Sequence, residues 1–254
     1  MSRQSDFDAL GFAIVPKVLD QAACGALRDL LGDAEGAGTR GMLRMPEVVQ
    51  LAESLLADLV RPHLPAKPIP VRGIFFDKRP ETNWLVAWHQ DLTLALKERV
   101  EVPGFGPWSV KEGVPHVQPP VGLLAQMLSV RLHLDDADST NGALRILPGS
   151  HRLGRLNAQA IQSCRETREE VCCEAKAGDA LLMRPLLLHA SSRSTSKRRR
   201  RVLHIEFAGF DLPAPLEWHE NPAHSGPHSP LCGSPLSASV TSCQNAFLPA
   251  EPKA

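Results

Sequence analysis

Residues 84–93 read Trp84-Leu-Val-Ala-Trp-His-Gln-Asp-Leu-Thr93, a strand-like run that carries His89 and Asp91 two positions apart. Side chains two positions apart on a strand point to the same side, so the imidazole and the carboxylate are expected to reach one point in space. A histidine and a carboxylate aimed together are two of the three ligands in the two-histidine, one-carboxylate set that holds non-haem Fe(II). The stretch therefore predicts a metal site that needs a third ligand from elsewhere.

The candidate for the third ligand is His189, which ends the apolar run LLMRPLLLH over residues 181–189. Arg200 follows eleven positions later, inside a run of four arginines at 198–201. A single histidine at a strand end is more often structural than metal-binding, so His189 is weak evidence when taken alone. The order of His189 relative to the other motifs is what supports its assignment as a metal ligand.

Four motifs occur in order along the chain: His89-Gln-Asp91, Pro148-Gly-Ser-His151, His189 and the arginines at 198–201. This pattern resembles the phytanoyl-CoA dioxygenase family of Fe(II)- and 2-oxoglutarate-dependent oxygenases, over roughly residues 10–213. A lone His-x-Asp is common by chance, whereas four features in family order are specific. The resemblance implies Fe(II) bound by His89, Asp91 and His189, 2-oxoglutarate and O2 as co-substrates, and a structural role for His151.

The far carboxylate of 2-oxoglutarate calls for a permanent, planar cation, which arginine supplies and lysine does not. Strand alternation places Arg198 and Arg200 on one face and Arg199 and Arg201 on the other, so only one pair can face a pocket. Arg200 stands at the family's spacing from the distal histidine and is the predicted ligand. The alternative is that the run is a solvated basic edge or a nucleic-acid patch, which the neutral net charge and the lack of interleaved aromatic residues disfavour.

Further site residues are predicted with explicit alternatives. By resemblance, Lys78 matches a co-substrate contact, although an exposed lysine explains it almost as well. Arg131 is predicted to assist in binding the co-substrate and His133 to contact the substrate, unless the two form a buried salt bridge with Asp135 or Glu206. Trp88 and Trp108 are predicted as substrate contacts, but an aromatic residue beside a site more often packs in the core.

Two later segments alternate between polar and apolar residues. Ser129, Arg131 and His133 share one face of residues 129–134, and Arg200, His204 and Glu206 share one face of residues 200–207. Polar strand faces usually meet water, but several from distant segments suggest the polar lumen of a barrel. We predict a mainly β fold, a double-stranded β-helix (jelly roll, cupin-like) with flanking N-terminal α-helices; solvent-facing strands are the alternative.

The domain organisation is predicted from local patterns. A short helix from residue 6 breaks at Gly11 before a strand, Asp20 caps a helix over 21–31, residues 32–41 form a loop, and 46–64 form another helix. Residues 1–70 are thus the helical flank of one domain, 1–212. The glycine- and proline-rich connection 97–120, which carries Trp108, is expected to be a lid. Residues 213–254 are a Pro/Ser/Gly-rich tail, anchored by Trp218 and partly disordered.

Composition narrows the class of protein. The 254 residues carry a formal net charge of zero, which provides no field to attract nucleic acid or an anionic membrane. The six cysteines show no Cys-x-x-Cys spacing, which favours a reduced compartment. No signal peptide or apolar run of about 18 residues occurs. We expect a soluble, cytoplasmic enzyme that acts on a small molecule, with neither nucleic acid nor membrane as a partner.

By resemblance, the enzyme hydroxylates an unactivated C–H bond of a small organic molecule and releases succinate and CO2. Relatives that halogenate replace the metal carboxylate with a small residue, so the presence of Asp91 argues for hydroxylation or a related oxidation. Two alternatives remain. One is a non-oxidative jelly-roll metal enzyme, an isomerase or hydrolase, and the other is a catalytically silent ligand-binding homologue.

Overall fold

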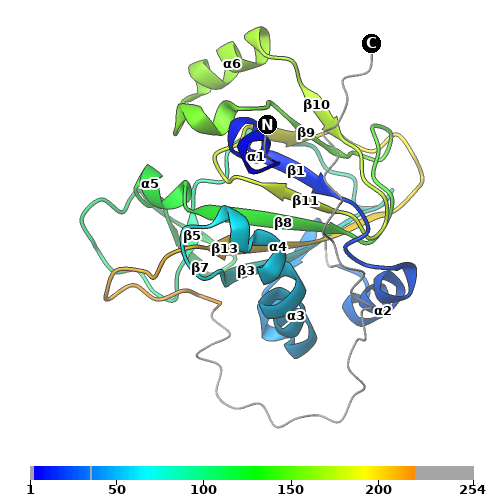
Figure 1. The fold of residues 1–254 in the computed structure, drawn as a ribbon, viewed down its shortest axis with the longest axis horizontal. Helices are drawn as coiled ribbons and strands as arrows, with labels where there is room; N and C mark the ends of the chain where they lie inside the picture. The colour runs from blue at the N-terminus through cyan, green and yellow to red at the C-terminus, as the bar shows by residue number, and fades with distance from the viewer. Residues whose placement is uncertain (1–2, 35, 221–254) are drawn as a thin grey trace.

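The computed structural model describes residues 3–34 and 36–220, which are drawn in colour in Figure 1. The predicted C-terminal tail, 213–254, therefore lies outside the described residues from 221 onward. Within its described part, Leu216 and Trp218 are buried, and Trp218 forms a β-bridge with Leu96. The anchoring role predicted for Trp218 is confirmed.

The core is built from antiparallel sheets whose neighbouring strands come from distant parts of the chain. The largest sheet has the order β1 (Phe12–Val15), β11 (Ala180–Met183), β8 (Met127–His133), β13 (Arg200–Ala208), β3 (Ile69–Lys78) and β2 (Gly38–Arg40). The second has the order β10 (Val171–Cys173), β9 (Leu144–Ile146), β12 (His189–Ser191) and β4 (Val86–His89). Antiparallel pairs with long crossovers make this the predicted jelly roll.

The helices of the N-terminal flank follow the sequence patterns. The main ones are α1 (Arg3–Leu10), α2 (Gln21–Leu31), α3 (Pro46–Leu51) and α4 (Ala57–Val60), whereas α5 (Val121–Leu124) and α6 (Ala158–Thr167) were not predicted. Residues 52–56 continue α3 into α4 as a π-helical turn. Asp20 caps α2 as expected, because its carboxylate accepts a hydrogen bond of 2.8 Å from the Ala23 N–H. The predicted loop at 32–41 needs correction, since its end forms strand β2 against β3.

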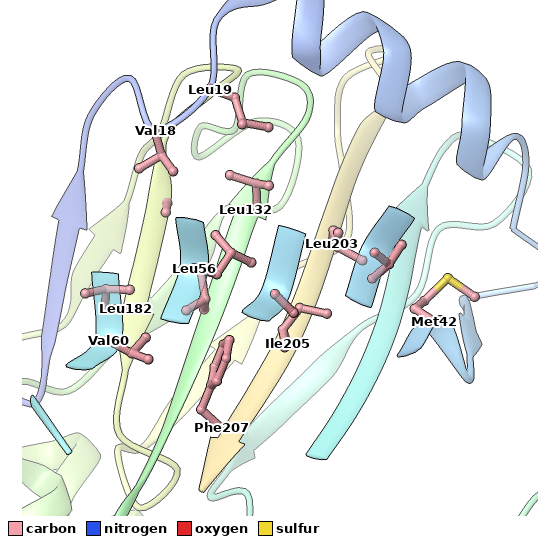
Figure 2. Packing of buried hydrophobic residues seen from close by; sticks show 14 of the residues in the cluster. Val18, Leu19, Met42, Leu56, Val60, Leu132, Leu182, Leu203, Ile205 and Phe207 are labelled. Atoms are coloured by element: carbon pink, nitrogen blue, oxygen red, sulfur yellow. The ribbon is translucent and has the colours of Figure 1, made fainter. Parts of the chain in front are cut away.

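One face of the large sheet is apolar and is covered by the N-terminal helices. Figure 2 shows Leu132, Leu203, Ile205 and Phe207 on the sheet and Leu56 and Val60 in the same cluster. All of these side chains are fully buried or nearly so. Burying a side chain of this size contributes about 1.5–3 kcal/mol each. This buried face packs the N-terminal helices on the sheet.

The opposite face is polar and lies inside the molecule. In the strand register, Arg131 on β8 is opposite His204 on β13, which is opposite Ile74 on β3. The next row joins Ser129, Glu206 and Arg72 in the same way. Because these polar side chains are buried or nearly so, the predicted polar lumen is confirmed and the solvent-facing alternative is wrong.

The connection at 97–120 is not a structureless lid. It contains β6 (Trp108–Lys111) and β7 (Val114–Val117), which form a hairpin that pairs with β5 (Leu94–Ala95). Its turn is made by Glu112 and Gly113, both at positive φ, as tight hairpin turns require. The hairpin carries one side chain, Lys111, to the lumen.

Candidate metal centre and its cavity

The three predicted ligands converge. His89 ends β4 and His189 begins β12, and the two are directly paired in the sheet. Asp91 lies between them in space: its Oδ1 is 3.7 Å from His89 Nε2 and its Oδ2 is 3.6 Å from His189 Nε2. One ligand atom from each residue lies within 4.8 Å of the others, which is the spacing a single metal ion requires.

Asp91 reaches the two histidines in a different way from the one inferred from the sequence. Strand β4 ends at His89, so Asp91 is not on the strand. Its backbone N–H instead donates a 2.9 Å hydrogen bond to the Pro185 carbonyl. Gln90, which lies between His89 and Asp91 in the sequence, fixes this segment. Its side-chain amide donates hydrogen bonds to the Gly154 and Leu186 carbonyls and accepts one from the Leu156 N–H. Hydrogen bonds to an irregular segment, not strand alternation, aim the carboxylate.

Backbone carbonyls set the orientation of both imidazoles. Nδ1 of His89 lies 2.8 Å from the Ala87 oxygen, and Nδ1 of His189 lies 2.9 Å from the Leu187 oxygen. A carbonyl only accepts, so each Nδ1 carries a proton, and Nε2 is the ring nitrogen that faces Asp91. This is the usual outer-sphere arrangement of metal-binding histidines.

The charge states also suit a cation. Burial alone would raise the pKa of Asp91, but His189 and His89 outweigh it and lower that pKa to about 2. Burial lowers the pKa of His189 to about 4. At neutral pH the site therefore offers a carboxylate and a neutral imidazole, the forms that bind metals.

The ligands open into a cavity of about 330 Å³ that lies between the two sheets. Apolar side chains of the wall include Ile74, Phe76, Trp84, Val86 and Leu92. The volume is at the lower end of the range of small-molecule sites.

Arg200 is the one arginine of the run 198–201 without a carboxylate partner among the described residues. Arg198 pairs with Asp138, Arg199 with Asp77 and Asp33, and Arg201 with Asp135. Arg200 is 2% exposed and lines the cavity.

Two nitrogens of that guanidinium, Nε and Nη1, have no hydrogen-bond partner among the described residues. Burial, with Arg131 nearby, lowers the pKa of Arg200 to about 9. A buried cation is costly unless an anion pairs with it. The far carboxylate of 2-oxoglutarate fits this requirement.

Arg131 and Lys78 adjoin this cation in different ways. Arg131 lines the cavity with an unpartnered Nε, and its Nη1 lies 3.3 Å from His204 Nδ1. Lys78 is fully buried, and its Nζ donates to Ser191 Oγ at 3.0 Å and to the Ser192 carbonyl at 2.7 Å. The exposed-lysine alternative for Lys78 is therefore wrong. Lys78 does not itself line the cavity but donates to Ser191, which does, so its contact with the co-substrate stays a prediction.

The alternative of a buried salt bridge for Arg131 and His133 is also wrong. Asp135 pairs with Arg201, and Glu206 pairs with Arg72 at 3.1 Å. His133 is 1% exposed, and neither ring nitrogen has a hydrogen-bond partner in the described chain. It does not line the cavity, so its predicted contact with the substrate needs correction.

The substrate roles predicted for Trp88 and Trp108 also need correction. Neither ring lines the cavity. Trp88 packs against a cluster with Leu147 and Leu188 and lies under the Arg145 guanidinium. Trp108 packs against the cluster around Leu94 and Val117. Both rings extend the apolar core, which is where large aromatic side chains gain most from burial.

Sequence reasoning missed three cations that line the cavity: Arg40, Arg72 and Lys111. Arg72 shares a face of β3 with Ile74, Phe76 and Lys78, so alternation over 72–78 was a signal that could have found it. Arg40 and Lys111 stand in segments interpreted as loops, where no periodicity assigns a direction.

The buried His133 leads to a prediction about pH. Burial, with Arg200 and Arg131, lowers its pKa to about 3 from a reference of 6.5. The unfolded chain takes up a proton that the folded state does not, so stability is present above pH 6.5 and is lost as the pH falls toward 3.

The His133→Phe variant is therefore expected to flatten the dependence of the unfolding free energy on pH. The expected difference in slope is about 1.4 kcal/mol per pH unit between pH 6 and 4. Urea titrations of both proteins without metal or 2-oxoglutarate measure it, and parallel curves would contradict the pKa assigned to His133.

Comparison with known proteins agrees with this geometry. The family model "Phytanoyl-CoA dioxygenase (PhyH)" matches residues 31–202. No curated protein matches the sequence. Among the described residues, no helix is long and apolar enough to cross a membrane.

Solved structures share the fold at low sequence identity. EctD from S. alaskensis with 2-oxoglutarate and 5-hydroxyectoine aligns with a TM-score of 0.65 at 16% identity, over 87% of this chain and 83% of that one. AviO1 from Streptomyces viridochromogenes Tue57 gives 0.59 at 23% identity, over 84% and 96%. SnoK, a non-haem alpha-ketoglutarate-dependent carbocyclase from nogalamycin biosynthesis, gives 0.60 at 17% identity, over 92% and 94%. These likenesses establish the fold.

Proposed function

Because this chain belongs to the phytanoyl-CoA dioxygenase family of Fe(II)- and 2-oxoglutarate-dependent oxygenases, we propose that it oxidises an unactivated C–H bond of a small organic molecule. In the proposed reaction, substrate, 2-oxoglutarate and O2 give hydroxylated product, succinate and CO2. His89, Asp91 and His189 are the proposed metal ligands, and Arg200 is the proposed ligand of the co-substrate.

One observation carries the proposal. The three ligand atoms lie within 4.8 Å of one another, and they open into the same cavity as Arg200. A hydrolase or isomerase that used the same triad would have no need of a buried, unpaired arginine in that cavity. A cation in this state is explained by a permanent anionic partner, which a dicarboxylic co-substrate supplies.

The residues of this chain have separate tasks in the reaction. Fe(II) and 2-oxoglutarate, when bound, supply the oxidising chemistry. His89, Asp91 and His189 would hold the metal through two imidazoles and one carboxylate, a ligand set that would leave coordination positions free for the co-substrate and O2. Arg200 binds the far carboxylate of 2-oxoglutarate, with Arg131 beside it. Ile74, Phe76 and Leu92 present apolar surface that excludes water from the reacting carbon.

The proposal is tested by anaerobic loading with Fe(II) and 2-oxoglutarate, followed by exposure to O2 and a screen of small metabolites. We expect succinate release to be stimulated by the substrate, with one atom from labelled O2 in the product. A product formed without succinate would indicate the non-oxidative alternative. Failure to bind Fe(II) and 2-oxoglutarate at all would favour the silent homologue.

The product of the proposed oxidation is a separate question from the co-substrate, and we propose hydroxylation. SnoK is a carbocyclase that depends on the same co-substrate, so a shared fold and co-substrate do not fix the final product. Asp91 keeps the coordination position that halogenating relatives open, which favours a hydroxylated product. The mass of the product distinguishes these outcomes directly: hydroxylation adds one oxygen atom, and ring closure removes two hydrogens.

A further inference from the structure

Lys111 is a cation at the mouth of the cavity with no carboxylate partner among the described residues. It lies at the end of β6, where the β6–β7 hairpin turns, and its side chain lines the cavity. Its one hydrogen bond within the described chain is from Nζ to Thr93 Oγ1, at 3.2 Å. Thr93 follows Asp91 by two positions, so this ammonium lies close to the segment that bears the proposed metal ligand.

Two arginines lie near this lysine. Arg40 on β2 forms an ion pair with Glu112, the residue that follows Lys111, which joins β2 to the tip of the hairpin. Its Nε is buried and lacks a hydrogen-bond partner within the described chain. Arg72 on β3 is neutralised by Glu206. The mouth therefore has an unpaired ammonium, and Arg40, which lines the same cavity, has a buried N–H without a partner among the described residues.

The charges of the cavity support an additional anion. Among the described residues, five cationic side chains line it, namely Arg40, Arg72, Lys111, Arg131 and Arg200, but only two carboxylates do, Asp91 and Glu206. Asp91 belongs to the proposed metal set, and Glu206 pairs with Arg72. Arg131 and Arg200 face the proposed co-substrate. Arg40 pairs with Glu112 outside the lining, so Lys111 is the cation that these pairings leave without an anion.

We propose that the substrate carries a carboxylate or phosphate group, which binds Lys111 Nζ at the mouth of the cavity, on the side lined by the Arg40 guanidinium. The proposal rests on the proposed function, because it takes the deeper cations as the site of 2-oxoglutarate. The apolar wall around Phe76, Val86 and Leu92 receives the rest of the molecule. The substrate class is thus a small organic acid or phosphate ester with an apolar body.

A cationic substrate fits the site less well. Glu206, the carboxylate outside the metal set, already has Arg72 at 3.1 Å and His204 at 3.4 Å. An ammonium group would have to displace these partners and approach Lys111. Like charges that meet in a partly desolvated cavity repel strongly, which makes that arrangement unfavourable.

Competitive labelling of amines tests the anion site without any substrate in hand. Protein loaded with Mn(II) and 2-oxoglutarate is treated with an acylating reagent, and the rate at Lys111 is read by peptide mass spectrometry. Inorganic phosphate and acetate are the two probes. We expect at least one of them to slow labelling of Lys111 in a saturable way; which one does so distinguishes a phosphate from a carboxylate site.

Lys176 is the internal control, because it is exposed on the surface, paired with Asp136 and absent from the cavity lining. Its labelling is expected not to respond to either probe. If neither anion protects Lys111, or if both lysines are protected equally, the proposed anion site is wrong. The same titration on metal-free protein measures anion binding at Lys111 even if the proposed metal and co-substrate sites are wrong.

Substitutions extend the test to turnover. With an anionic substrate, Lys111→Glu is expected to raise KM about 10- to 100-fold, the effect of losing one charge-assisted hydrogen bond. Lys111→Arg is expected to restore much of the loss, and Lys176→Glu to behave as wild type. Binding of 2-oxoglutarate stays unchanged in all three variants, which separates this proposal from the proposed function. A neutral or cationic substrate whose KM ignores Lys111→Glu would overturn it.

Discussion

The Asp91→Ala variant is expected to lose metal binding and 2-oxoglutarate-dependent turnover together. Asp91 is the single anion of the proposed ligand set, and its oxygens lie between the two imidazoles. Replacing groups that merely orient a metal ligand costs about 10- to 100-fold in affinity, so removing a ligand should cost more than about 100-fold. Metal content after dialysis and succinate formation measure the two losses.

The matched control for Asp91 is Asp136→Ala, which removes an exposed carboxylate paired with Lys176. That variant should keep wild-type metal content and turnover. Asp91→Asn is a second, isosteric variant that removes the charge without opening space, and it should fail in the same way. Full metal occupancy and activity in either Asp91 variant would rule out the ligand assignment.

The Arg200→Ala variant is expected to raise the KM for 2-oxoglutarate by about 30-fold or more while metal binding persists. Truncating one partner of a buried, hydrogen-bonded charge pair costs about 2–5 kcal/mol. Arg200→Lys should recover only part of the loss, because an ammonium does not reproduce the planar fork that binds a carboxylate. Initial rates of succinate formation against 2-oxoglutarate concentration measure the effect.

Two observations separate a binding role for Arg200 from a structural one. The variant should not lower the thermal stability of the protein without co-substrate, because the native guanidinium has no carboxylate partner among the described residues and its burial is unfavourable. Arg198→Ala, a neighbouring arginine paired with Asp138 at the surface, should leave the KM unchanged. If Arg198→Ala weakened the binding of 2-oxoglutarate and Arg200→Ala did not, the co-substrate ligand would be Arg198 and the assignment to Arg200 would be wrong.

Much of this architecture was predictable because local pattern and tertiary position agree. The cap at Asp20, the apolar face of Leu203 and Ile205, and the polar face of Arg131 and His204 all follow from spacing alone. The motif order located the three side chains that the structure brings together. It also singled out Arg200 among four adjacent arginines.

The remaining features depend on contacts that no local pattern encodes. The direction of Asp91 is set by a hydrogen bond to Pro185, almost a hundred residues later. Trp88 and Trp108 look like substrate contacts in the sequence, but each finds an apolar cluster assembled from distant segments. Lys111 reaches the cavity because a hairpin formed within an apparent loop.

The central claim is that His89, Asp91 and His189 bind one ferrous ion in a cavity that also holds 2-oxoglutarate. A crystal structure of the protein loaded anaerobically with Fe(II) and 2-oxoglutarate tests it most directly. We expect one metal bonded to Nε2 of both histidines and to an oxygen of Asp91, with a carboxylate of 2-oxoglutarate on Arg200. A metal bound elsewhere, or a His189 ring turned away from it, would contradict the account.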